Sequence, residues 1–185
     1  MAQDENGGRA ELILVTGPPG SGKSTVARLL ADSFPSSALV PGDQFFSFIR
    51  GGRIEPWLPE AREQNEAVTR AAAAAAGRLA AGRYLVVYDG VVGPWLLPTF
   101  VEDAGRLDRL HYVVLLPPEE VCLDRVRSRV GHGFTDLPAT RHMYRNFAEA
   151  PIGARHVVTS VDPAEAVAAA IRARVADGSL LVDVG

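Results

Sequence analysis

The feature that most restricts the fold of this chain is a glycine-rich loop between an apolar run and the start of a helix. The apolar run is 12–16, and Gly17 with Gly22-Lys23-Ser24 fits the pattern G-x-x-x-x-G-K-[ST]. A phosphate chain needs several N–H donors that converge on one point. A loop that wraps around it needs backbone conformations that glycine adopts easily. The helix after the loop adds its positive dipole end and unpaired N–H groups. The pattern therefore predicts a phosphate-binding loop that joins a buried strand to a helix.

The lysine of this loop is the only lysine in a chain with 19 Lys and Arg residues. Elsewhere the sequence uses arginine as its cation, but Lys23 offers a compact ammonium that can act as a point charge between phosphate oxygens. We therefore predict that Lys23 takes part in catalysis. The predicted nucleotide-binding residues are those of the loop and the helix start: Gly17, Pro18, Pro19, Gly20, Ser21, Gly22, Lys23, Ser24 and Thr25.

Length and charge limit the class of protein. The 185 residues suit one domain with a full core, and we expect residues 1–10 to form a frayed terminus before a single domain at 11–185. A net charge of −3 argues against a nucleic-acid or membrane-surface binder. The single cysteine, Cys122, excludes an internal disulfide framework. With no apolar leader or membrane-length run, we expect a soluble, cytoplasmic monomer or homodimer.

Apolar runs alternate along the chain with stretches of helical periodicity. The runs predict strands at 11–16, 38–40, 83–88, 110–116 and 155–159, and a minor edge strand at 180–184. The predicted helices lie at 24–33, 44–50, 59–81, 94–104, 119–130, 139–148 and 163–176. We read the alanine run 71–76 as helix packing rather than disorder. This order predicts an α/β fold: a five-stranded parallel sheet with helices on both faces and a short helical lid at about 125–150.

Polar residues follow four of the predicted strands, so we expect them to meet at one rim of the sheet; they lie at 17–24, 43, 89–90 and 159–162. Ser24 has a hydroxyl that can bind Mg²⁺, and Asp89 closes the third strand where an acid can hold the same ion. For Asp89 the alternative is a structural Asp-Gly turn. Asp43 closes the second strand and can act as a general base or help to hold Mg²⁺. Its alternative is a helix cap.

Two arginines of the helix after the fourth strand share one face. Arg125 and Arg129 are four residues apart, whereas Arg127 points elsewhere and we expect it to be solvated. The segment Gly131-His-Gly133 interrupts the helix just beyond them. This pattern indicates a lid that brings guanidinium charge to the phosphates as it closes. The alternative is a solvated charged face, and His132 we expect to be merely exposed.

Together these residues resemble the small P-loop kinases of metabolites and nucleotides. The segment 119–129 is similar to an adenylate kinase segment that contains two arginines four residues apart. In that segment the first arginine lies on adenine and the second contacts the phosphates. That resemblance implies these roles for Arg125 and Arg129. Asp89-Gly90 resembles the Asp-Gly of the same family. The stretches 129–134, 146–151 and 56–58 and the Gly42-Asp43 step resemble gluconate kinases. Asp43 also matches the aspartate that chloramphenicol phosphotransferases use as a base.

The chain also departs from these families. Adenylate kinases follow Asp-Gly with Phe-Pro-Arg, where this chain has 91–93 as Val-Val-Gly. Gluconate kinases have a histidine at the position of Phe46. Both departures disfavour nucleoside monophosphates and gluconate as acceptors. Aromatic residues flank the predicted acceptor side and indicate an acceptor less polar than a sugar acid, or simply core packing; they are Phe45, Phe46, Phe48, Trp57 and Trp95.

The function predicted from the sequence is ATP- and Mg²⁺-dependent transfer of the γ-phosphate to a hydroxyl of a small molecule. One alternative is a P-loop ATPase or nucleotide-binding switch whose output is conformational. A second is a kinase of a nucleic-acid end or of a nucleotide sugar, as in polynucleotide kinases and zeta-type toxins. The acidic balance of the chain weakens the nucleic-acid form.

Overall fold

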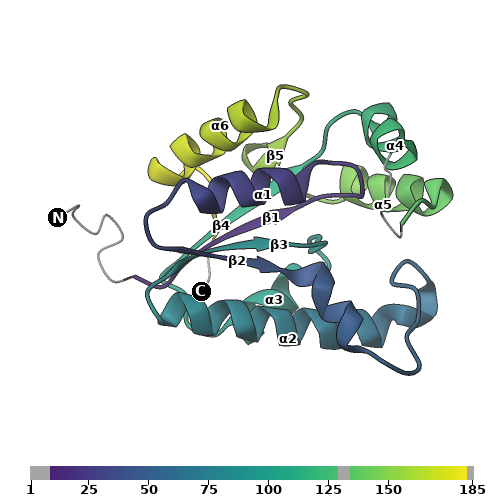
Figure 1. Ribbon diagram of the computed structural model, residues 1–185, viewed down its shortest axis with the longest axis horizontal. Coiled ribbons are helices and arrows are strands. Elements are labelled where there is room, and N and C mark those ends of the chain that lie inside the picture. Colours follow the sequence, from purple (N-terminus) through teal and green to yellow (C-terminus); the bar gives the residue numbers. More distant parts are fainter. Residues whose placement is uncertain (1–8, 129–133, 183–185) are drawn as a thin grey trace.

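The computed structural model describes residues 9–128 and 134–182. A sheet lies at the centre of the molecule, between two layers of helices (Figure 1). The strands are β1 (Glu11–Thr16), β2 (Ser37–Pro41), β3 (Leu85–Asp89), β4 (Arg109–Leu115), β5 (Val157–Val158) and β6 (Leu181–Val182). Their order is β2-β3-β1-β4-β5, all parallel, and β6 pairs with β4 in the antiparallel direction. The predicted parallel α/β sheet with helices on both faces is confirmed.

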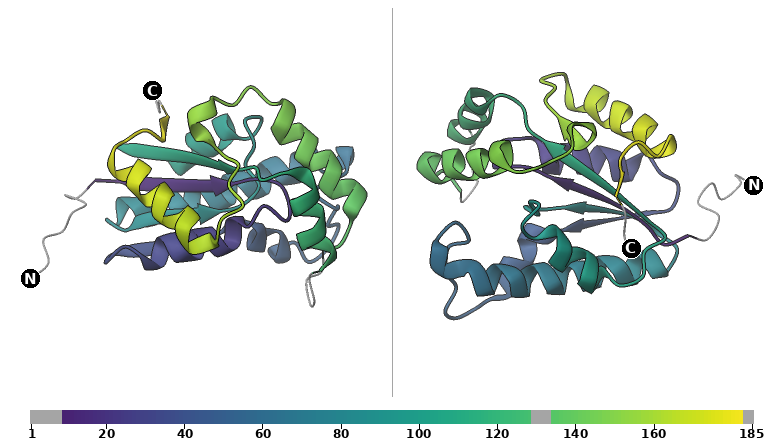
Figure 2. Two further views of the ribbon diagram at one scale, coloured as in Figure 1. Left: turned by 90° about the horizontal axis from the view of Figure 1, so that it is seen from above. Right: turned by 180° about the vertical axis from the view of Figure 1, so that it is seen from behind.

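The α-helices are α1 (Lys23–Asp32), α2 (Arg62–Ala81), α3 (Leu97–Ala104), α4 (Glu119–Arg127), α5 (Leu137–Glu149) and α6 (Ala164–Ala176). Three short 3-10 helices join them: η1 (Gly42–Phe48), η2 (Pro59–Ala61) and η3 (Ala154–His156). Helices α1 and α6 cover one face of the sheet, and α2 and α3 cover the other (Figure 1). Helices α4 and α5 lie beyond the carboxyl ends of the strands (Figure 2). These two helices therefore partly cover the carboxyl-terminal edge of the sheet, where loops follow the strands.

Alternating residues of the central strands fill the two cores. In β1, Leu12 and Leu14 face the α2–α3 layer, while Ile13 and Val15 face the α1–α6 layer. All four are fully buried, as expected for a strand covered on both faces. The alanine run packs as predicted: Ala72, Ala73 and Ala76 are also fully buried. Small side chains here let α2 lie close to α3, because a Cβ on Gly77 would overlap the backbone of Ala104.

Several predicted boundaries are wrong for identifiable reasons. The third strand begins at Leu85 rather than at residue 83, because Arg83 adopts a φ of 69° in the turn that leaves α2. The fifth strand keeps only Val157–Val158 of the predicted 155–159. Its first residues instead form η3, in which the buried His156 contacts the carbonyl of Tyr112 through Nδ1 at 3.0 Å. The helix predicted at 119–130 ends at Arg127.

A buried ionic cluster lies at the opposite end of the sheet from the glycine-rich loop. The carboxylate of Glu11 accepts a hydrogen bond from His111 Nε2 at 2.7 Å and lies 3.5 Å from Arg109 Nη1. Burial alone would raise the pKa of Glu11. The His111 bond and the charges of Arg109, His111 and Arg9 outweigh it and hold this pKa below its ordinary value of 4.5. The cluster therefore favours the charged form of Glu11 in the folded chain.

Candidate active site

The glycine-rich loop follows β1 and runs into α1. Gly20 and Gly22 have φ values of 82° and 94°, a region that favours glycine. A side chain on Gly20 would also overlap the carbonyl oxygen of Cys122 in α4, so the loop and that helix pack closely. The turn is closed by Ser21 N, which donates to Pro18 O at 3.2 Å. Lys23 begins α1 and is only 9% exposed, so its ammonium is held at the loop.

Strand register brings the predicted acidic residues to this loop. Asp89 pairs with Val15 of β1 on one side and with Pro41 of β2 on the other. Two residues beyond Val15 the glycine-rich loop starts, and two residues beyond Pro41 comes Asp43 at the start of η1. Asp89 therefore stands between the loop and Asp43, as the rule for carboxyl ends of parallel strands predicts.

Lys23 lies beside both carboxylates. Its Nζ is 3.8 Å from Asp43 Oδ2, with 11% of the Lys23 side chain and 54% of the Asp43 side chain exposed. Its charge also acts on the carboxylate of Asp89, where it opposes the rise in pKa that burial causes. One buried cation thus interacts with one half-exposed acid and one buried acid. In this arrangement the Lys23 ammonium can bind phosphate oxygens, and the half-exposed Asp43 carboxylate can accept a proton.

Asp89 has the features of a metal ligand. The residue is 7% exposed, and its Oδ1 has no hydrogen-bond partner among the residues that the structure describes. Burial raises the pKa of Asp89, against the lowering effects of the Lys23 charge and of a hydrogen bond from the Ser24 hydroxyl; the charge of Asp43 adds to the rise. A divalent cation would satisfy the unpaired oxygen and favour the charged form. A hydroxyl and a carboxylate in contact are oxygen donors that Mg²⁺ prefers, so the pair fits this ion.

Few protein ligands surround the proposed metal position. Within 9–128 and 134–182, no group of three or more His, Cys, Asp or Glu side chains could hold a metal ion. Mg²⁺ commonly uses one or two protein groups and completes its shell with phosphates and water. A second buried oxygen at the loop, Ser21 Oγ, likewise lacks a partner in the described part of the chain. Each is a buried oxygen that a bound phosphate or cation would satisfy.

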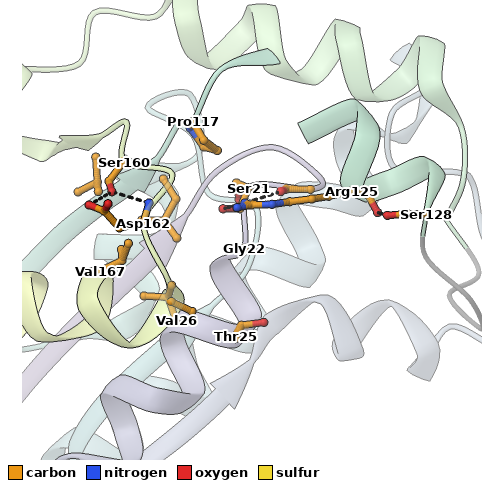
Figure 3. A pocket seen from close by; sticks show the side chains of 14 residues that line it. Ser21, Gly22, Thr25, Val26, Pro117, Arg125, Ser128, Ser160, Asp162 and Val167 are labelled. Carbon is orange, nitrogen blue, oxygen red and sulfur yellow. Dashed lines mark hydrogen bonds between the residues drawn. The ribbon is translucent and has the colours of Figure 1, made fainter. Parts of the chain in front are cut away.

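Arg125 reaches the loop from α4. Its Nη1 donates to the carbonyls of Gly20 and Ser21, each at 3.3 Å (Figure 3). Arg127 is exposed and pairs with Asp124 at 3.0 Å, as expected of a solvated side chain. Arg129 and His132, also considered from the sequence, lie outside the described residues. Helix α4 is tied to α5 by an ion pair of Glu119 with Arg141 at 3.7 Å.

A cavity of about 380 Å³ adjoins the loop. Figure 3 shows it between the loop, Arg125 and the segment that leads from β5 to α6. Its walls come from the loop, α1, β4, α4, β5 and α6: Gly20, Ser21, Gly22, Thr25, Val26, Leu115, Pro117, Arg125, Ser128, Val158, Ser160, Asp162, Ala164 and Val167. The sequence placed 159–162 at this rim but gave those residues no role. The signal available was their position directly after the fifth strand.

Two tryptophans of the predicted acceptor side contact phenylalanines. Trp57 contacts Phe134 edge-on with ring centres 4.8 Å apart, which joins the η1–η2 connection to the segment before α5. Trp95 lies against Phe147 of α5 at 5.1 Å. An open cavity of about 610 Å³ beside this pair is lined by Pro94, Trp95, Asn146, Glu149, Ala150 and Pro151. The predicted aromatic flank is therefore partly core and partly accessible.

One contact that positions Asp43 carries no signal in the sequence. The hydroxyl of Tyr88, from β3, packs against Gly42 so closely that a Cβ there would overlap it. Burial, together with the charges of Asp43 and Asp89, raises the pKa of Tyr88, so its hydroxyl stays neutral. In the sequence Tyr88 looks like any apolar strand residue. In the structure it sets where η1, and with it Asp43, can lie.

The sequence was also compared with known proteins and structures. The AAA domain family matches residues 12–151. None of the curated proteins matches the chain. The Deinococcus radiodurans tunicamycin resistance protein has a similar structure, with a TM-score of 0.67, 19% identity, and 95% of this chain and 99% of that chain covered. A gluconokinase from Sinorhizobium meliloti 1021 is also similar, with a TM-score of 0.61 and 25% identity; the match covers 91% of this chain and 95% of that chain. The Mycobacterium tuberculosis APS kinase has a TM-score of 0.64 and 17% identity; the match covers 91% of this chain and 98% of that chain. The fold is that of the small P-loop kinases.

Proposed function

The chain belongs to the AAA domain family, and on that premise we propose that it is an ATP- and Mg²⁺-dependent kinase that phosphorylates a hydroxyl of a small molecule. Family and fold support a nucleotide-binding phosphotransferase in general. The observation that carries the narrower proposal is the half-exposed carboxylate of Asp43, 3.8 Å from the loop lysine. A kinase needs a carboxylate at this place to receive the proton of the acceptor hydroxyl, whereas nucleotide binding alone needs no such group.

In the proposed complex the loop N–H groups and Lys23 hold the β- and γ-phosphates. Ser24 and Asp89 would hold Mg²⁺, which when bound neutralises phosphate charge. Asp89 Oδ1, which is buried without a partner in the described part of the chain, and the Ser24 hydroxyl that acts on the same carboxylate support this assignment. Ser21, whose hydroxyl is buried without a described partner, is placed to donate to a phosphate oxygen.

Asp43 would act as the general base. The acceptor oxygen attacks the γ-phosphorus, the bond from that phosphorus to the bridging oxygen breaks, and ADP leaves. The acceptor proton passes to the Asp43 carboxylate. In the ligand-free chain this carboxylate is paired with Lys23. Phosphates that bind the Lys23 ammonium would break this ion pair and leave Asp43 free to contact the acceptor. We therefore expect nucleotide binding to activate Asp43 as the general base.

The helices α4 and α5 would form the lid. Arg125 already lines the cavity beside the loop and can lie on the nucleotide base there. The edge-on contact of Trp57 with Phe134 joins the lid to the acceptor side. Arg129, proposed from the resemblance to reach the phosphates, completes the set. Closure would exclude water from the transferring group.

The test is ADP release from the full chain with Mg²⁺ and ATP against a panel of hydroxyl-bearing metabolites and antibiotics. We expect at least one compound to raise ADP release well above the rate without acceptor, and Lys23→Ala to abolish the increase. ADP release at one rate whatever compound is added would contradict the kinase assignment. It would favour the ATPase or switch instead.

A further inference from the structure

A tyrosine hydroxyl is fixed next to the proposed general base. Tyr88 lies near the end of β3 and is only 3% exposed. Its hydroxyl packs against Gly42, the residue before Asp43, and its ring packs against Gly90; a Cβ on either glycine would overlap the tyrosine. The ring also contacts Phe100 edge-on, with ring centres 4.8 Å apart. Tyr88 therefore has little room to move, and its hydroxyl is held at the start of η1.

This hydroxyl can donate a hydrogen bond that it does not make in the ligand-free chain. Another buried tyrosine, Tyr112, donates its hydroxyl hydrogen to the carbonyl of Val92 at 2.9 Å. Tyr88 forms no hydrogen bond of this kind with any residue that the structure describes. Burial first, and then the charges of Asp43 and Asp89, raise the pKa of Tyr88, so the hydroxyl keeps its proton. Buried donors in folded proteins are rarely without a partner, so a hydrogen-bond acceptor that arrives during function would satisfy this one.

Of the two acids whose charges act on Tyr88, Asp43 is the one that can move to its hydroxyl. Asp89 is the next residue of β3, and successive side chains of a strand point to opposite faces of the sheet. Asp43 directly follows the glycine that the hydroxyl contacts, and 54% of its side chain is exposed. Within the described residues Lys23 is the only cation that is paired with Asp43. If Lys23 takes another partner, the Tyr88 hydroxyl is the donor beside this carboxylate.

A bound nucleoside triphosphate would compete with Asp43 for the Lys23 ammonium, because phosphate oxygens bind that group and repel the carboxylate. We propose that Tyr88 is a positioning residue: when phosphates bind Lys23, the Asp43 carboxylate exchanges this partner for the Tyr88 hydroxyl. The rigid hydroxyl then fixes the position of the mobile carboxylate in the nucleotide complex. The inference rests on the proposed function and adds the group that holds the general base once the ion pair is broken.

The test is a double-mutant cycle on ATP affinity, which does not require the phosphorylated compound to be known. ATP displaces trinitrophenyl-ATP, in the presence of Mg²⁺, from the full chain as wild type, Tyr88→Phe, Asp43→Ala and the double variant. Because the hydroxyl makes its hydrogen bond only in the complex, Tyr88→Phe should weaken ATP binding by about 3- to 10-fold. Alanine at position 43 leaves no carboxylate to hold. In that background Tyr88→Phe should therefore have no further effect.

Tyr84→Phe is the matched control, because Tyr84 is an exposed tyrosine just before β3, and it should bind ATP as the wild type does. A purely structural role of the Tyr88 hydroxyl would weaken ATP binding equally with and without the Asp43 carboxylate. That result, or unchanged affinity in Tyr88→Phe alone, would overturn the proposal and leave the proposed function standing. Failure of the wild type to bind ATP would instead contradict the proposed function, and the exchange of partners with it.

Discussion

Replacing Asp43 by Asn separates three roles that this residue can have. The amide keeps the shape of the side chain and its ability to cap a helix, but it loses the charge and cannot accept the proton. If Asp43 is the general base, we expect kcat to fall by about 10²–10⁴-fold. The structure adds a second expectation, for nucleotide affinity.

The size of that second effect follows from the ion pair with Lys23. Unit charges 3.8 Å apart attract by about 1 kcal/mol in water-like surroundings, and the 54% exposure of the Asp43 side chain places the pair in that regime. Removing the competing carboxylate leaves the ammonium free for phosphates. ATP should therefore bind as tightly as to wild type or up to about fivefold more tightly.

The assay measures kcat by coupled ADP detection and nucleotide affinity by displacement of a fluorescent ATP analogue, for wild type and Asp43→Asn. Asp32→Asn, an exposed carboxylate at the far end of α1, is the control and should match wild type. Unchanged kcat in Asp43→Asn would refute the base role. A loss of Mg²⁺-dependent ATP binding by tenfold or more would reassign Asp43 to the metal.

Substitutions at four further positions, with one control, test other parts of the site and the fold. Lys23→Ala should stay folded by circular dichroism but lose nearly all transfer, and Lys23→Arg should fail too, because its planar fork does not fit a loop built for a point charge. Arg125→Ala should raise the nucleotide KM by about 3- to 30-fold through lost stacking, with little change in kcat. Gly42→Ala should lower the free energy of unfolding by about 1–3 kcal/mol, because its Cβ would overlap a tyrosine hydroxyl. Gly51→Ala, which has open space around it, should be nearly neutral in the same melts. Because folding lowers the pKa of Glu11, its contribution to stability is present above the unfolded value near 4.5 and is lost as pH falls through the folded pKa. The stability gap between wild type and Glu11→Gln should therefore shrink below about pH 4.5, and a constant gap would contradict the ionic account.

The sequence predicted those features that depend on local pattern. The first strand, 11–16, was predicted with its observed bounds, because a continuous apolar run before a glycine-rich loop leaves little choice. The meeting of Asp43, Asp89 and the loop followed from one rule about the carboxyl ends of parallel strands. These parts of the site needed no knowledge of side-chain packing.

Contacts between distant segments could not be predicted in this way. Nothing in the sequence indicates that Tyr88 packs on Gly42, or that Ser160 and Asp162 share a cavity with Arg125. The fifth strand was predicted too long because its apolar residues suit a strand, whereas His156 turns into η3 to reach Tyr112. In each case tertiary contacts decide the local structure, and a single sequence does not reveal them.

The most direct test of the central claim is the fate of the γ-phosphoryl group in water enriched in ¹⁸O. The full chain is incubated with Mg²⁺, ATP and an acceptor that raises ADP release, and the phosphorus-containing products are examined by mass spectrometry. If the attacking oxygen belongs to the acceptor hydroxyl, the product is a phosphorylated acceptor without ¹⁸O, and it forms in the same amount as ADP. Inorganic phosphate carrying ¹⁸O in that amount, with the acceptor unmodified, would show that water is the nucleophile and would contradict the kinase assignment.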